Sequence, residues 1–147
     1  MTKLYLKAAV ICNNMLKLPE LSAVLEYKNA SVISQFCIEH PDITPTQAEQ
    51  IFQDLLAWLW LSVNRIQRQL TTHMIAPLTL LDNMWHNFIL HTKSYTEFCE
   101  HYFNQYLHHE VEKVGFEFTP STDELSEFLS DCYDYLGEAW ICRYFSL

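Results

Sequence analysis

The chain has 147 residues, the length of one ordinary domain, and half of them are apolar, which is enough to bury a sizeable core. Residues 94–147 carry eleven acidic and two basic side chains, whereas residues 1–93 carry seven of each, so the net charge of −9 arises entirely from the C-terminal part. No basic footprint for nucleic acid is present, which excludes that class of partner. The acidic part is suited either to a partner protein with a basic surface or to keeping an aromatic-rich domain soluble.

The numbers of glycine and cysteine residues limit the possible fold classes and cellular compartments. The two glycines, Gly115 and Gly137, are too few for the turns of a strand-rich fold, which predicts an all-α, compact bundle of about six or seven helices in a single domain, residues 1–147. Five cysteines without a C-x-x-C pair predict reduced thiols and a cytoplasmic protein. We expect neither a secretory signal nor a membrane span, because the longest apolar run, residues 55–61, is far below the roughly 18 residues needed.

The N-terminal third shows helical periodicity. A first helix is predicted up to Pro19 from one apolar stripe, formed by Leu4, Ala8, Ile11, Met15 and Leu18. Residues 20–39 predict two shorter helices, because residues 28–31 interrupt the apolar pattern.

A long helix is predicted to begin at Thr44, where Pro45 fits the first helical position and Gln47 completes a capping box. Its apolar stripe extends to Leu70, and residues 55–61 are apolar on all sides. This pattern predicts a central helix covered on several sides. The alternative is a homodimer through a self-association surface around Trp58 or Trp60.

Three later helices are predicted from their start signals. Thr79 with Asp82 and Ser94 with Glu97 indicate two helices that meet near residues 92–94. The last helix opens near residues 121–124 and keeps one apolar face as far as Trp140.

Residues 81–109 concentrate side chains that could bind a metal. Asp82 and His86 are four residues apart and therefore share a helix face. If the two helices of this segment pack antiparallel, His108 or His109 could approach that face, with Cys99 further along. Carboxylate, imidazole and thiolate groups form an adequate ligand set for zinc or ferrous iron. The hypothesis is a metal site formed by Asp82, His86, Cys99 and His109.

Two other interpretations remain open for the same residues. In the structural one, Asp82 stabilises a helix N-terminus, His86 bonds to a neighbour, and Cys99 and the aromatic side chains fill the core. In the catalytic one, a histidine activates Cys99 as a nucleophile, which ranks lower because neither chain neighbour of Cys99 would stabilise a thiolate. The chain contains no phosphate-binding loop, G-x-S-x-G elbow or H-E-x-x-H pair, so we assign no enzymatic activity.

The same segment carries a family resemblance. Its spacing, Asp82-x-x-Trp85-His86-x-Phe88-Ile89-Leu90-x-Thr92-x-x-Tyr95-x-x-Phe98-Cys99, followed by Phe103 and His108-His109, resembles the glycine-rich domain-containing-protein-like family of bacteria and larger plant proteins. Members often have glycine and then phenylalanine before the histidine pair, where this chain has Asn104 and Tyr106. The resemblance implies a helical fold and special residues but no substrate.

Two functional hypotheses follow. The first is a small protein-binding or regulatory module, such as an enzyme inhibitor or effector accessory, that acts through its acidic, aromatic-rich surface. The alternative is a metal-binding protein, metal-dependent enzyme or sensor with the Asp/His/Cys/His cluster at its centre.

Overall fold

The computed structural model describes residues 15–110 and 119–145, and these residues form helices and contain no β-strand, as the all-α prediction requires. The α-helices are α1 (Leu21–Leu25), α2 (Ala30–Glu39), α3 (Pro45–Gln67), α4 (Thr79–Leu90), α5 (Thr92–Phe103), α6 (Thr122–Asp131) and α7 (Glu138–Tyr144). A 3-10 turn, η1 (Ala76–Leu78), precedes α4, and a π-helical turn, η2 (Cys132–Leu136), joins α6 to α7. The helix predicted to end before Pro19 falls mainly on residues 1–14, outside the described residues, and residues 16–20 are not helical.

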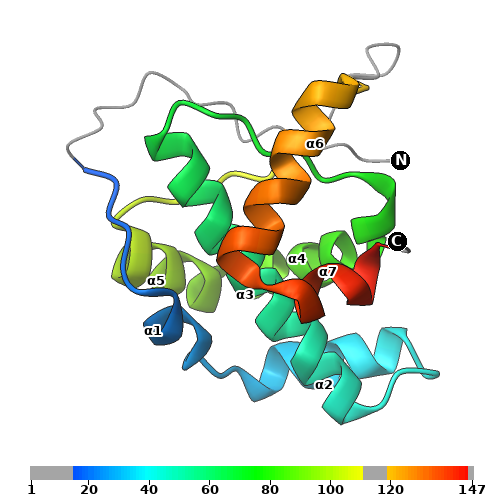
Figure 1. Ribbon diagram of the computed structural model, residues 1–147. Coiled ribbons are helices and arrows are strands. Elements are labelled where there is room, and N and C mark those ends of the chain that lie inside the picture. Colours follow the sequence, from blue (N-terminus) through cyan, green and yellow to red (C-terminus); the bar gives the residue numbers. More distant parts are fainter. Residues whose placement is uncertain (1–14, 111–118, 146–147) are drawn as a thin grey trace.

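Helix α3 is the central element of the fold. Its predicted capping box is present: the Gln47 amide donates to the Thr44 hydroxyl over 3.2 Å, and the Gln47 side chain accepts from the Thr44 amide over 2.9 Å. In Figure 1, α3 runs through the middle of the molecule, with α2 crossing near its N-terminal end and α6 passing in front.

The middle of α3 is covered by the chain itself. Trp58 is fully buried and Trp60 is only 8% exposed, and the Trp60 indole donates to the Pro19 carbonyl over 2.7 Å. These two side chains therefore offer little exposed surface for the self-association considered from the sequence, because their apolar area is already buried against the chain's own elements. Fully burying one such large apolar side chain contributes about 1.5–3 kcal/mol, which makes this packing a main source of stability.

Helices α4 and α5 form a hairpin that bends at His91. Helix α5 begins at Thr92, two residues before the predicted start at Ser94. Helix α4 begins at Thr79, as the start signal predicts, but the Thr79 hydroxyl donates back to the Ala76 carbonyl over 2.7 Å and does not cap the helix. Asn87 of α4 donates to the Val32 carbonyl over 2.7 Å and thereby fastens the hairpin to α2.

The C-terminal helix begins as predicted but does not continue as predicted. The hydroxyl of Ser121 caps α6 by accepting from the Glu124 amide over 3.2 Å. The chain then widens into η2 and breaks at Gly137, whose φ of 93° and ψ of 165° lie in a region open essentially to glycine alone. The predicted single helix to Trp140 is therefore two helices separated by a turn.

Buried ionic groups hold this C-terminal part on α3. Asp54 of α3 is 3% exposed and accepts from the Arg143 guanidinium over 2.6 and 2.7 Å and from the Tyr144 hydroxyl over 2.5 Å. At the other end, Arg65 and Arg68 both pair with Asp131 at the end of α6. Together these contacts place α6, η2 and α7 along one side of α3.

None of the helices in residues 15–110 and 119–145 combines the length and apolar character required to cross a bilayer.

Candidate metal centre

Helix α4 supplies two of the polar side chains of the predicted site. Asp82 lies in its first turn, and His86 follows one turn later on the same face, as the i, i+4 spacing predicts. The Asp82 side chain is 12% exposed and the His86 side chain is 46% exposed, so the pair extends from the protein interior to the surface.

The third side chain, His109, is delivered by a return segment, residues 104–110, rather than by a helix. Helix α5 ends at Phe103, and Asn104 adopts a left-handed conformation with φ 57° that turns the chain back. Residues 105–110 are not helical, so His109 approaches α4 from a non-helical segment and not from the second helix of an antiparallel pair. Near the end of this segment, His109 Nε2 lies 2.9 Å from Asp82 Oδ1.

The environment of His109 is almost closed. Its side chain is 6% exposed, and its ring centroid lies 4.7 Å from that of Trp85 and 4.1 Å from that of His86. His109 therefore lies against the indole on one side and the second imidazole on another. A charge-assisted hydrogen bond to a partly buried carboxylate is among the stronger polar contacts in proteins, which fixes the ring in this position.

His86 is oriented by the backbone of its own helix. Its Nδ1 lies 2.9 Å from the Asp82 carbonyl oxygen, and because a carbonyl only accepts, Nδ1 must carry the proton in that bond. The neutral ring then has its lone pair on Nε2. A histidine that binds a metal through one nitrogen commonly donates the other N–H to a carbonyl in this way.

Among the described residues, Asp82, His86 and His109 form a group in which one possible ligand atom of each lies within 4.8 Å of the others. Ligands around tetrahedral zinc lie about 3.3 Å apart, given bonds of about 2.0–2.1 Å. Small side-chain movements would therefore suffice to place all three atoms on one ion. Two imidazole nitrogens and one carboxylate oxygen suit zinc or ferrous iron better than calcium or magnesium, and three ligands leave at least one position for water.

Cys99 does not join this group, in contrast to its predicted place among the ligands. It is fully buried in α5, where its thiol lies close to the Tyr95 hydroxyl and to the backbone of Leu107. Burial raises the pKa of the Cys99 thiol to about 11. The thiol therefore remains protonated at neutral pH, which does not suit the nucleophile considered from the sequence.

The structure also distinguishes between the two neighbouring histidines. His108 is exposed and its ring lies 4.7 Å from that of Tyr106, whereas His109 faces Asp82. The aromatic members of the motif are buried, in agreement with their predicted place in the core: Trp85, Phe88, Tyr95, Phe98 and Phe103.

Hydrogen bonds between buried aromatic side chains were not foreseen from the sequence. The Trp85 indole N–H donates to the Tyr95 hydroxyl over 3.0 Å, and that hydroxyl donates to the Leu107 carbonyl over 2.5 Å. The sequence indicates them only through residue type, because a buried Trp or Tyr usually finds a partner for its polar atom.

Comparison with known proteins gives one finding: a family model described as UCP032817-like matches residues 21–125, which include α1 to α5 and the three grouped side chains. No curated protein and no solved structure matches the chain.

Proposed function

The chain belongs to the UCP032817-like family, and we propose that it binds a divalent transition-metal ion, zinc or ferrous iron, through Asp82, His86 and His109. The observation that carries the proposal is the close approach of one donor atom from each of these residues, within 4.8 Å. The three residues come from two separate segments, so their approach is a property of the tertiary fold and not of helical spacing alone.

Three further features support this proposal. The ring of His86 is held beside the Asp82 carboxylate, because its Nδ1 lies 2.9 Å from the Asp82 carbonyl oxygen and 3.5 Å from Asp82 Oδ1. The carboxylate of Asp82 and the imidazole of His109 are largely shielded from water, where their attraction for a cation is strongest. The resemblance of residues 82–109 to the glycine-rich domain-containing-protein-like family also points to these residues as special, and we retain that finer kinship as part of the proposal.

The proposed site has three protein ligands, so water or another small molecule would complete the coordination. A metal held in this way is accessible from the side of the half-exposed His86. Such an open position is typical of catalytic and sensory sites, whereas structural zinc is usually enclosed by four protein ligands. We therefore propose that the protein is a metal-dependent enzyme or sensor and that the site is not a structural zinc site.

Titration of tag-free protein with zinc in the presence of a competing chelator tests the proposal. We expect one ion per chain, and at least about 100-fold weaker binding in His109→Ala and in His86→Ala, because loss of an outer partner alone commonly costs 10–100-fold. His108→Ala is the matched control, since it removes the exposed neighbouring imidazole, and its affinity should equal that of the wild type. Equal zinc affinity in all four proteins would refute the site.

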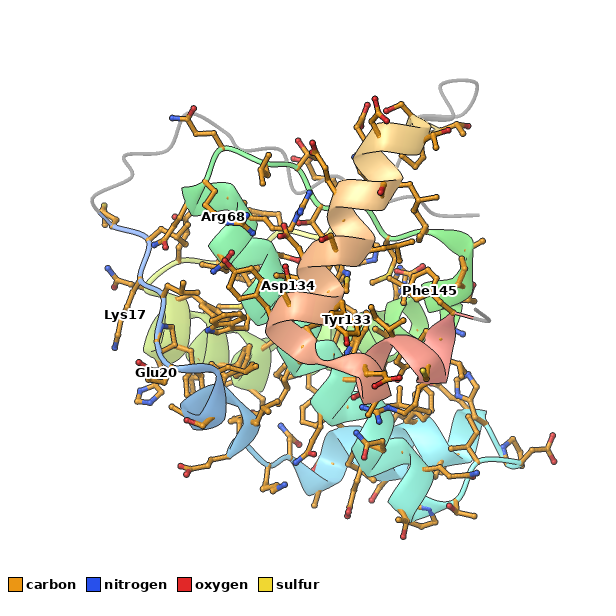
Figure 2. All side chains as sticks on the ribbon, in the orientation of Figure 1. Lys17, Glu20, Arg68, Tyr133, Asp134 and Phe145 are labelled. Atoms are coloured by element: carbon orange, nitrogen blue, oxygen red, sulfur yellow. The ribbon has the colours of Figure 1, made fainter. Side chains whose placement is uncertain are left out.

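A second function, protein binding, is favoured by a separate observation on the C-terminal helices. Residues 119–145 contain six acidic side chains and one basic side chain. Tyr133 of η2 is 55% exposed and Tyr135 is 40% exposed, and Figure 2 shows Tyr133 and Asp134 beside the lower end of α6. The ring of Tyr135 packs against Trp60 and under the Arg68 guanidinium, so Tyr133 is the more accessible of the two. An exposed tyrosine beside acidic side chains is suited to a partner with a basic face, because aromatic anchors and complementary charge both favour association.

Pull-down experiments with matched variants test this second function. Wild-type protein at low salt should retain a basic partner stoichiometrically, and Tyr133→Ser with Asp134→Asn should lose it while keeping its zinc affinity. The control is Lys93→Gln, an exposed charge on α5 away from this surface, which should retain the partner. If no stoichiometric partner is retained at low salt, or if both variants retain it equally, protein binding through this surface is excluded.

A further inference from the structure

Two residues of the motif, Tyr95 and Cys99, lie outside the proposed ligand set but near the segment that delivers His109. We infer that they are positioning residues: together they hold Leu107, and thereby place His109 for metal binding. The inference rests on the proposed metal site, and it assigns these side chains a role distinct from ligation or simple core packing.

The carbonyl end of Leu107 is held by Tyr95. The Tyr95 side chain is fully buried, and its hydroxyl donates to the Leu107 carbonyl over 2.5 Å while accepting from the Trp85 indole over 3.0 Å. Burial raises the pKa of Tyr95 far above its usual value, so the hydroxyl remains a donor at every physiological pH. The Tyr95 side chain thus links the return segment to Trp85 of α4, the residue next to His86.

Cys99 lies beside the backbone of Leu107. Its thiol is close enough to the Leu107 backbone and to the Tyr95 hydroxyl for both to lower its pKa, against the larger effect of burial. Leu107 itself is 2% exposed, so its side chain adds apolar packing to these polar contacts. A non-helical segment held by so many contacts at one residue has little freedom there.

The position of Leu107 limits where His109 can lie. Two residues of chain span at most about 7 Å, so fixing Leu107 confines the His109 backbone to a small volume beside α4. Trp85 completes the arrangement, because its indole donates to Tyr95 and its ring lies 4.7 Å from that of His109. The ligand and the residues that hold its segment are therefore packed as one unit.

The start of the return segment is fixed independently of Tyr95. The Lys17 amide donates to the Phe103 carbonyl over 2.9 Å, and the Asn104 side chain donates to the Met15 carbonyl over 2.8 Å. Loss of the Tyr95 hydroxyl should therefore loosen residues 105–110 without releasing the end of α5. This separation allows the positioning role to be tested in a folded protein.

Tyr95→Phe removes the hydroxyl and retains the ring. We expect it to weaken zinc binding by about 10- to 100-fold, the usual cost of losing a partner that orients a ligand. Cobalt(II) in place of zinc provides a second readout: its visible absorption in Tyr95→Phe should change shape, because His109 no longer occupies one defined position. Tyr144→Phe is the matched control, because it also removes a hydroxyl that makes a 2.5 Å hydrogen bond. That bond is made to Asp54, where α7 meets α3, so this variant should bind zinc and cobalt as the wild type does.

The outcomes separate this inference from the metal site itself. If the wild type binds zinc and both tyrosine variants bind equally well with unchanged cobalt spectra, the positioning role is wrong and the site stands. If the wild type binds no zinc, the proposed function fails first. Should Tyr95→Phe not fold, Cys99→Ala decides: weaker zinc binding than in Cys132→Ala, another buried cysteine, supports the inference, and equal binding overturns it.

Discussion

At the scale of single residues, burial determines what the cysteines can do. Burial raises the pKa of Cys99 to about 11 and that of Cys132 to about 12, although the nearby Arg65 guanidinium opposes the shift at Cys132. Both are therefore neutral thiols at physiological pH, which are poor nucleophiles. Cys142, in contrast, is exposed.

Alkylation of the folded protein with iodoacetamide at pH 8, mapped by mass spectrometry, checks this difference. We expect Cys142 to be modified before both buried thiols, which should react only after unfolding in urea, because access and thiolate character are then restored. Unfolded protein under the same reagent is the control, in which all three sites should react. Modification of Cys99 at the rate of Cys142 in the folded protein would contradict the structure.

The sequence indicates the proposed ligand residues only in part. The i, i+4 spacing predicts that Asp82 and His86 share a face, because that spacing is fixed by the geometry of a helix. It cannot select His109 over His108, since that choice depends on the course of residues 104–110. That course depends on the left-handed backbone conformation of Asn104. Asparagine tolerates this conformation, but its presence in a sequence does not predict it.

At the scale of elements, the helices with chemical start signals are the predictable ones. The capping box at Thr44 and the cap at Ser121 are both present at the predicted residues, because a side-chain oxygen that satisfies a free amide acts locally. Helices α4 and α5 lack a side-chain cap, and although α4 begins at the predicted Thr79, α5 begins two residues before the predicted Ser94. Their ends are set by packing in the hairpin, which no local pattern encodes.

The turn between α6 and α7 shows that a continuous apolar stripe in the sequence does not exclude a break in the helix. Leu125, Phe128, Cys132 and Trp140 fit one helical face, yet the chain is interrupted between them by η2 and Gly137. A π-helical turn adds a residue to the helical repeat, so the apolar face can continue while the axis changes. The change of direction places the last helix, α7, on Asp54, a contact 89 and 90 residues away in the chain.

At the scale of the whole molecule, composition predicts the fold class and tertiary packing determines the site. Few glycines and a high apolar content are sufficient to indicate a helical bundle, and the apolar middle of α3 is sufficient to indicate its centre. The approach of α4 to the return segment depends on contacts among buried side chains from several elements, such as the ring of Trp85 against those of Trp58 and His109. Such pairings are long-range, and a single sequence does not specify them.

The central claim concerns which atoms would surround the metal. Asp82, His86 and His109 are the proposed ligands, while Cys99 is buried in the core. A nitrogen- and oxygen-bound ion differs from a sulfur-bound one in bond length, at about 2.0–2.1 Å against about 2.3 Å for zinc.

X-ray absorption spectroscopy at the zinc edge, on tag-free wild-type protein loaded with one equivalent of zinc, measures that difference directly. We predict nitrogen and oxygen neighbours alone at about 2.0–2.1 Å, with the outer scattering of two imidazole rings. A sulfur neighbour at about 2.3 Å, or the absence of imidazole scattering, would contradict this ligand set.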